Sequence, residues 1–351
     1  IFIGDFPGYL VALRKAASGN QLSEVWRFHP PAASSWHSTP AIGRDGTVYI
    51  GFSTGRLTPD AKSTFYALRA PSSGAEAQVV WTVDFGPGRQ TSSPTIGPDG
   101  TIYGVNAGGK LFAISPDGKV KWTAQAGPTI QASPALGMDG AVYLASMDGK
   151  LYAASPPANS SGSDGSIKWT FDFTQHLGTT PFPTAEGPYP TKQPFGASGV
   201  GTLASPSVGP DGTIYLGESN SNMYAVTQDG QLKWMFEAQR EIAGIASTAA
   251  ISADGGTLYF GANKGGIYAL NTSDGKQKWS FAVYGSIDPS PTLDSKGTLY
   301  SGSTLGHVFA LDAATGQQIF DYDAGAAVWT APAILPDGSL VVATRKGKVL
   351  L

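Results

Sequence analysis

The chain has 351 residues, of which 41% are hydrophobic and 14% are charged, so it is long and apolar enough to bury a sizeable core. Its formal net charge is −3 and it contains no run of basic residues, which argues against a nucleic-acid footprint or an anionic membrane surface. It has no cysteine, which excludes disulfides, thiolate zinc sites and cysteine nucleophiles within these residues.

A self-similar unit that begins near Ser-Pro and ends at an aromatic residue recurs about every forty residues. In chain order the units run from Thr39-Pro40 to Trp81, Ser93-Pro94 to Trp122, Ser133-Pro134 to Trp169, Ser205-Pro206 to Trp234, Ser247 to Trp279 and Ser290-Pro291 to Phe320. Such a period indicates an array of identical supersecondary units, so the repeat decides the fold.

Each unit holds four apolar runs that are too short for helices, and we name the four predicted strands A to D. In one unit they are Pro206–Val208, Thr213–Gly217, Met223–Val226 and Gln231–Phe236. Asp-Gly separates A from B, as at Asp211-Gly212, and a similar pair separates C from D. The unit is therefore an antiparallel meander. Radial stacking of such sheets covers both apolar faces, which predicts an all-β fold, a single β-propeller of four-stranded blades.

The number of blades follows from the partial units at the two ends. The C-terminal residues add A, B and C strands at 332–335, 340–344 and 348–351, and the N-terminal residues add B, C and D strands at 1–4, 9–13 and 25–28. We expect eight blades with one edge strand absent from each terminal blade, and seven blades with a shared closing blade is the alternative. Residues 1–351 are predicted to form one domain with an insertion loop at 172–203.

The repeat resembles the pyrroloquinoline quinone (PQQ)-like propeller repeat along nearly the whole chain. The clearest instance is Gly265-Gly266-Ile267-Tyr268-Ala269-Leu270 followed by Gly275-Lys276-Gln277-Lys278-Trp279. The resemblance implies that the tryptophan of strand D docks between blades. The corresponding residues here are Trp26, Trp81, Trp122, Trp169, Trp234 and Trp279, with Phe320 in the seventh position.

The family includes quinoprotein dehydrogenases that bind PQQ with calcium, and also non-catalytic scaffolds such as the bacterial outer-membrane barrel-assembly lipoprotein. This chain lacks the cysteine pair that many of those enzymes place against the cofactor, and no matching set of calcium ligands is recognisable. We therefore assign no catalytic residue, no metal ligand and no cofactor. PQQ with calcium remains an alternative that we do not favour.

In a propeller the D–A loops and the B–C turns share one face, and here these loops are diverse whereas the A–B turns are uniform. Binding residues concentrate on variable loops of a rigid scaffold, so we place a ligand on this face. The candidate ligand-binding residues are Trp36, His37, Arg89, Gln131, Glu218, Arg240, Asp288 and Trp329. The two tryptophans are the strongest because they stand where other units carry small or polar residues.

The longest departure from the repeat is residues 172–203, which are rich in proline and aromatic residues. A long excursion of this kind is typical of a lid or a partner-binding loop. The residues that we expect to contact a partner are Phe173, His176, Phe182, Tyr189 and Phe195.

The leading hypothesis is a non-enzymatic binding or scaffold propeller that takes a protein, a peptide or a glycan. The second hypothesis is a PQQ- and calcium-dependent oxidoreductase, and the third is a glycan hydrolase or lyase. Low charge with abundant serine, threonine and glycine favours an extracytoplasmic location, periplasmic or secreted. We expect no nucleic-acid partner and no transmembrane segment, and a monomer is compatible with the sequence.

Overall fold

The computed structural model describes the chain except for residues 5–7, 18, 20, 32, 36–37, 55–61, 89–91, 159–163, 177–200, 239–243, 264 and 284. The described residues pack into two compact units. Unit 1 contains Ile1–Ser146 and Leu151–Thr170, and unit 2 contains Met147–Lys150 and Phe171–Leu351.

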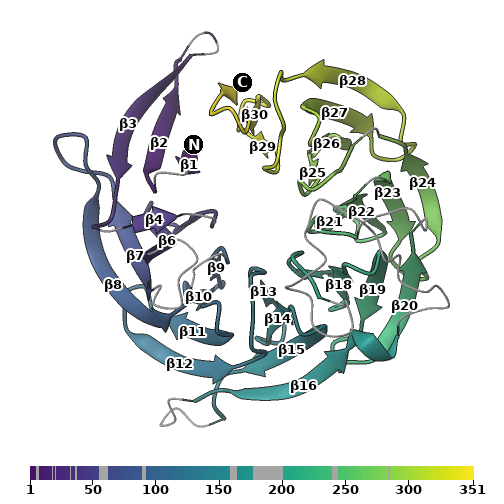
Figure 1. The fold of residues 1–351 in the computed structure, drawn as a ribbon, viewed down its shortest axis with the longest axis horizontal. Helices are drawn as coiled ribbons and strands as arrows, with labels where there is room; N and C mark the ends of the chain where they lie inside the picture. The colour runs from purple at the N-terminus through teal and green to yellow at the C-terminus, as the bar shows by residue number, and fades with distance from the viewer. Residues whose placement is uncertain are drawn as a thin grey trace. The chain divides into compact units, whose positions relative to one another are not determined.

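Four antiparallel sheets belong mainly to unit 1, and Figure 1 labels their strands. Sheet 1 contains β1 (Phe2–Gly4), β2 (Leu10–Lys15) and β3 (Leu22–Phe28). Sheet 2 contains β4 (Ala33–Ser35), β5 (Ala41–Ile42), β6 (Val48–Thr54), β7 (Lys62–Arg69) and β8 (Gln78–Pro87). Sheet 3 contains β9 (Thr95–Ile96), β10 (Ile102–Val105), β11 (Lys110–Ile114) and β12 (Val120–Gln125). Sheet 4 contains β13 (Ala135–Leu136), β14 (Val142–Ser146), β15 (Lys150–Ser155) and β16 (Ser166–Asp172).

Four further sheets belong to unit 2. Sheet 5 contains β17 (Ser207–Val208), β18 (Ile214–Gly217), β19 (Asn222–Val226) and β20 (Leu232–Glu237). Sheet 6 contains β21 (Ala250–Ile251), β22 (Thr257–Ala262), β23 (Gly266–Asn271) and β24 (Gln277–Phe281). Sheet 7 contains β25 (Thr292–Leu293), β26 (Thr298–Gly302), β27 (His307–Asp312) and β28 (Gln318–Asp323). Sheet 8 contains β29 (Ala333–Ile334), β30 (Leu340–Ala343) and β31 (Val349–Leu350).

In sheets 3 to 7 the strands are paired in sequence order, as a meander requires. The only helix in the described part of the chain is the 3-10 turn η1 (Phe173–Gln175). The protein is therefore an all-β, eight-bladed propeller. This confirms the predicted fold class and the favoured number of blades, and the seven-blade alternative does not hold.

Sheet 2 contains one strand that the repeat does not predict. β5 pairs with the start of β6 through Ala41↔Tyr49, whereas β4 pairs with its end through Ala33↔Thr54. β5 is two residues long, like the first strand of sheets 3 to 8, but β6 has seven residues, so the rest of that edge of β6 has no partner in β5. β4 covers this part of the edge and supplies partners for its backbone groups.

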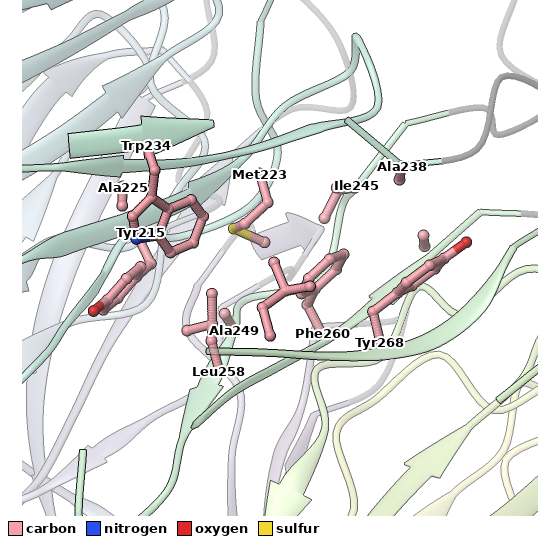
Figure 2. Packing of buried hydrophobic residues seen from close by; sticks show 12 residues of the cluster. Tyr215, Met223, Ala225, Trp234, Ala238, Ile245, Ala249, Leu258, Phe260 and Tyr268 are labelled. Atoms are coloured by element: carbon pink, nitrogen blue, oxygen red, sulfur yellow. The ribbon is translucent and has the colours of Figure 1, made fainter. Parts of the chain in front are cut away.

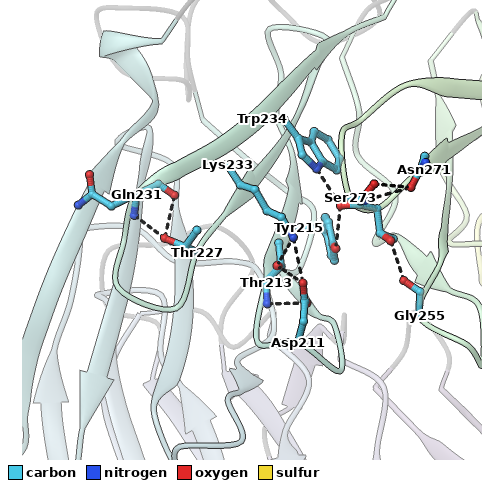
Figure 3. A network of polar contacts seen from close by, with 11 residues as sticks. Asp211, Thr213, Tyr215, Thr227, Gln231, Lys233, Trp234, Gly255, Asn271 and Ser273 are labelled. Atoms are coloured by element: carbon cyan, nitrogen blue, oxygen red, sulfur yellow. Dashed lines mark hydrogen bonds and ion pairs between the residues drawn. The ribbon is translucent and has the colours of Figure 1, made fainter.

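In sheets 2, 3 and 5 an aspartate and a threonine fix the turn between strands A and B. In sheet 5 the carboxylate of Asp211 accepts hydrogen bonds from the backbone N–H of Thr213 at 3.0 Å, from its hydroxyl at 2.8 Å and from Lys233 Nζ at 2.9 Å (Figure 3). Burial alone would raise the pKa of Asp211, but the bonds from Lys233 and Thr213 outweigh it and lower this pKa to about 2. Asp211 is therefore a turn former that stays charged, and hydrogen bonds at the equivalent turns lower the pKa of Asp45 and Asp99 as well.

Apolar side chains of neighbouring sheets fill the space between those sheets. Sheet 5 contributes Tyr215, Met223 and Trp234, and sheet 6 contributes Leu258 and Phe260, all of them buried. Figure 2 shows Met223 between Trp234 and Phe260. Similar clusters lie between sheets 6 and 7 and between sheets 3 and 4.

The indole of strand D contacts the C–D turn of the next sheet. Trp234 Nε1 donates a hydrogen bond to the carbonyl of Thr272 at 2.9 Å, and Trp279 Nε1 donates to the carbonyl of Ala313 at 3.0 Å (Figure 3 shows the first). The indole of Trp234 also packs closely against Gly275 in that turn. A Cβ placed on Gly275 would lie 2.7 Å from the indole, which is too close for a side chain at this position. Phe320 in sheet 7 lacks a donor and is 40% exposed.

Candidate ligand-binding face

The described residues of three D–A loops of unit 2, β20–β21, β24–β25 and β28–β29, lie between the B–C turns of two consecutive sheets. In the loop between β20 and β21, Ile245 N donates to the carbonyl of Glu218 at 3.0 Å and the carbonyl of Gly244 accepts from Asn263 N at 3.0 Å. The loop between β28 and β29 repeats the pattern through Val328 and Ala327. These loops and turns together form what we call the loop face of unit 2.

A buried aliphatic residue holds each of these loops in place. The side chain of Ile245 packs against Gly217 at the end of β18. A Cβ on Gly217 would overlap this side chain, so the close contact depends on the glycine. The residues at this position are all buried: Ile245, Ile287 and Val328 in unit 2, and Ile130 in the β12–β13 loop of unit 1. The loops are thus anchored to the sheets by packing and by backbone hydrogen bonds, which gives the face a preformed shape.

Three of the predicted binding residues follow these anchors directly in the sequence. They are Gln131, Asp288 and Trp329, and Ala246 holds the same position after Ile245. Gln131 and Asp288 are partly buried, whereas Trp329 is 48% exposed. These residues therefore hold one equivalent position in the β12–β13, β24–β25 and β28–β29 loops, where the side chain varies from loop to loop while the preceding residue stays aliphatic.

Glu218 occupies a turn position that other sheets use for capping. In sheet 3 the side chain of Asn106 accepts a hydrogen bond from Lys110 N at 2.9 Å, and in sheet 7 Ser303 Oγ accepts from His307 N at 3.2 Å. Glu218 is 0% exposed, and neither carboxylate oxygen has a hydrogen-bond partner.

The neighbouring backbone amides offset this burial only in part. Ser219 N donates to the carbonyl of Gly201, and Gly201 N donates to Ser219 Oγ. Desolvation raises the pKa of Glu218 well above its usual 4.5, the amides of Ser219 and Gly201 oppose this rise without cancelling it, and the nearby Asp148 adds to it. Glu218 is thus held toward its neutral form.

We expect Glu218→Gln to stabilise the protein at neutral pH by about 1–2 kcal/mol. A carboxyl whose pKa is raised on folding does not lower stability below its unfolded pKa. It lowers stability increasingly as pH rises toward the folded pKa. The difference between variant and wild type should therefore approach zero below about pH 4.5. Urea unfolding across this pH range measures it, and a difference that is constant with pH would contradict the burial of an unpartnered carboxyl.

Asp288 resembles Glu218 in its electrostatics, because burial raises its pKa and its Oδ1 has no hydrogen-bond partner. The two acids stand on different loops, one after β18 and the other after β24. Within the described residues, no three histidine, aspartate or glutamate side chains converge in a way that could hold a metal ion. The described acidic side chains therefore do not cluster as the carboxylate ligands of a calcium ion would.

Trp329 is paired with a cation from the neighbouring turn. The guanidinium of Arg345 lies over the indole at 4.3 Å from the ring centroid. One ring face of Trp329 is therefore already covered, which leaves less room for stacking a flat cofactor than an open indole would give.

The start of the insertion loop is fixed to sheet 5. Tyr224 Oη donates to the carbonyl of His176 at 2.8 Å, and the rings of Tyr224 and Phe173 lie 4.8 Å apart. The ring of His176 stacks on Phe171. Phe173 is completely buried in this arrangement, and the contact of Phe173 and His176 with a partner stays a prediction.

Seven predicted residues lie outside the described part of the chain: Trp36, His37, Arg89, Arg240, Phe182, Tyr189 and Phe195. Sequence reasoning missed the aliphatic anchors Ile130, Ile245, Ile287 and Val328, and also Arg345 as the partner of Trp329. A signal for the anchors exists, because an aliphatic residue recurs four residues before the proline position of strand A in three of these loops.

The comparisons with known proteins agree with this architecture. The sequence profile described as outer membrane protein assembly factor BamB matches residues 61–189 and 139–289, which together span about two thirds of the chain. The chain therefore belongs to this family of PQQ-like repeat propellers. The comparison with curated proteins finds no match.

Several solved structures share the fold. BamB from Moraxella catarrhalis is 16% identical with a TM-score of 0.66, covering 99% of this chain and 89% of its own. Sqt1 from Chaetomium thermophilum bound to the N-terminus of ribosomal protein L10 is 16% identical with a TM-score of 0.66, covering 86% and 80%. Sqt1 from the same organism, in another crystal structure, is 15% identical with a TM-score of 0.70, covering 99% and 84%. At this identity the likeness establishes the fold alone.

The described part of the chain holds no helix with the length and hydropathy of a membrane span.

Proposed function

We propose that the protein is a non-enzymatic scaffold that binds a protein or peptide on its loop face. The observation that carries this proposal is the anchoring of the D–A loops between B–C turns, with a variable residue displayed beside each buried anchor. A preformed surface with variable side chains suits recognition, because little conformational entropy is lost when a partner binds.

The relatives support a protein partner over a glycan. The family description names an outer membrane protein assembly factor, and one Sqt1 structure contains the N-terminus of a ribosomal protein. We also propose an extracytoplasmic location, which the family description supports. The strand-D tryptophans, such as Trp234 and Trp279, are proposed to hold neighbouring sheets together so that the loop face keeps its shape.

Site-selective crosslinking tests the scaffold. The chain has no cysteine, so two separate variants, Leu305→Cys and Met138→Cys, each carry a single thiol. This thiol reacts with one maleimide-benzophenone, a photocrosslinker. Leu305 lies in the β26–β27 turn on the loop face and is 60% exposed, whereas Met138 lies in the A–B turn of sheet 4 and is 81% exposed. We expect illumination in an extract of the source cells to give a discrete protein adduct at Leu305 and a much weaker one at Met138.

The more exposed Met138 position serves as the control for non-specific labelling. Equal adducts at both positions, or none at Leu305, would count against the loop face as the binding surface. An adduct that glycosidase treatment removes would favour a glycan ligand instead.

A further inference from the structure

We propose that the exposed patch formed by Leu305, Trp329, Arg345, Lys346 and Lys348 docks an acidic peptide segment that also carries apolar side chains. The proposal rests on the scaffold function and specifies the chemistry of its partner. The patch belongs to the loop face of unit 2 and combines a stacked indole and guanidinium with further cations.

The positive charge of the patch stands out in a chain whose net charge is −3. The turn between β30 and β31 carries Arg345, Lys346 and Lys348, and all three are exposed. Residues 344–349 contain no acidic residue. None of the three forms an ion pair with another described residue. These cations are therefore available to an anionic partner.

The backbone holds the indole and the guanidinium in register. Arg345 N donates to the carbonyl of Ala327 at 2.8 Å, and Val328 forms an antiparallel bridge with Thr344. The two segments that carry Trp329 and Arg345 are thus paired directly beside these side chains. A guanidinium that stacks on an aromatic ring keeps its N–H edge open for a bidentate bond to a carboxylate.

Apolar contacts come from the same loops. Trp329 is 48% exposed, and the turn that carries Leu305 contacts the Trp329 loop through the hydrogen bond from Val328 N to the carbonyl of Ser303 at 3.0 Å. Exposed tryptophan and arginine are the residues that most often dominate binding energy at protein interfaces. The geometry favours a segment in which acidic residues alternate with apolar ones.

An anionic membrane would also attract cations, but the patch fits a peptide better. Polybasic membrane sites use about four to eight lysine or arginine residues, each contributing about 1 kcal/mol. Three cations on an acidic protein fall below that range, whereas one bidentate arginine with an aromatic neighbour suffices for a carboxylate in a peptide.

Fluorescence polarisation with defined peptides tests the proposal. We expect a short fluorescein-labelled peptide of alternating glutamate and phenylalanine to bind in the micromolar to millimolar range. Peptides that alternate lysine with phenylalanine, or glutamate with serine, should bind about tenfold more weakly or not at all. Arg345→Glu should reduce affinity for the first peptide about tenfold or more, and Arg345→Lys should reduce it several-fold because the planar fork is lost.

Lys296→Glu is the matched control, because it makes the same change of charge at an exposed A–B turn of sheet 7 and should leave the affinity unchanged. Trp329→Ala should weaken binding about as much as Arg345→Glu. Both side chains are exposed, so we expect both variants to fold, and far-UV circular dichroism checks this.

The proposal is overturned by equal binding of the acidic and basic peptides, by unchanged affinity in Arg345→Glu, or by no binding to the wild-type protein. Binding to phosphatidylglycerol vesicles without binding to the acidic peptide overturns it in favour of a membrane. These outcomes are distinct from failure of the scaffold function, because a crosslinked protein adduct at Leu305 with no acidic-peptide binding would reject only the acidic chemistry assigned to the partner.

Discussion

Trp234→Ala is expected to lower the free energy of unfolding by about 3–5 kcal/mol, among the largest effects of any single truncation in unit 2. Trp234 is 8% exposed, packs in the cluster between sheets 5 and 6, and donates to the carbonyl of Thr272. Its removal leaves a cavity, and the carbonyl of Thr272 keeps only the long hydrogen bond from Tyr215 Oη at 3.5 Å. Urea unfolding followed by far-UV circular dichroism measures the loss.

Two further variants separate the causes. Trp234→Phe keeps most of the apolar area but loses the Nε1 donor, so a smaller loss of about 1–2 kcal/mol is expected. Trp329→Ala removes an exposed indole and should change stability by less than about 0.5 kcal/mol. If Trp234→Ala were as mild as Trp329→Ala, the indole would not hold the two sheets together.

The second large effect is expected at the glycine that receives this indole. Gly275 has a φ of +70°, and a Cβ there would lie 2.7 Å from the Trp234 ring. Gly275→Ala should therefore destabilise the protein by about 2–5 kcal/mol, of which about 1–2 comes from the left-handed backbone and the rest from overlap with the ring. Equilibrium unfolding of the variant gives the total.

A double-mutant cycle isolates the contact between the glycine and the indole. In the Trp234→Ala background, Gly275→Ala should lower stability by only about 1–2 kcal/mol, because the overlap has gone. Gly297→Ala is the matched control, since Gly297 has a φ of +86° with no atom within 4 Å of the added Cβ. Strictly additive effects would mean that the glycine and the indole do not interact.

Much of the fold could be predicted from local chemistry. The Asp-Gly turns recur because an aspartate can bond the backbone two residues on, as Asp211 does with Thr213, and this chemistry is visible in the sequence. β4 could not be predicted, because its pairing depends on the part of the long β6 edge that lies beyond β5. Edge coverage is a property of the assembled sheet.

The candidate face was predicted in outline, and its details depend on packing. The diversity of the D–A loops indicated where to look, and Trp329 is displayed there. Glu218 has the residue type of a surface ligand, yet it lies at a capping position whose burial the sequence does not reveal. The Arg345–Trp329 stack joins residues from two loops and follows only from the register between them.

The central claim, that this propeller meets its partner on the loop face, is tested most directly by the ratio of crosslinked adducts at Leu305→Cys and Met138→Cys. The account predicts one dominant protein adduct at the Leu305 position, lost on competition with excess unlabelled protein. A stronger adduct at Met138 under the same competition would contradict it, because the uniform A–B turns would then be the binding surface.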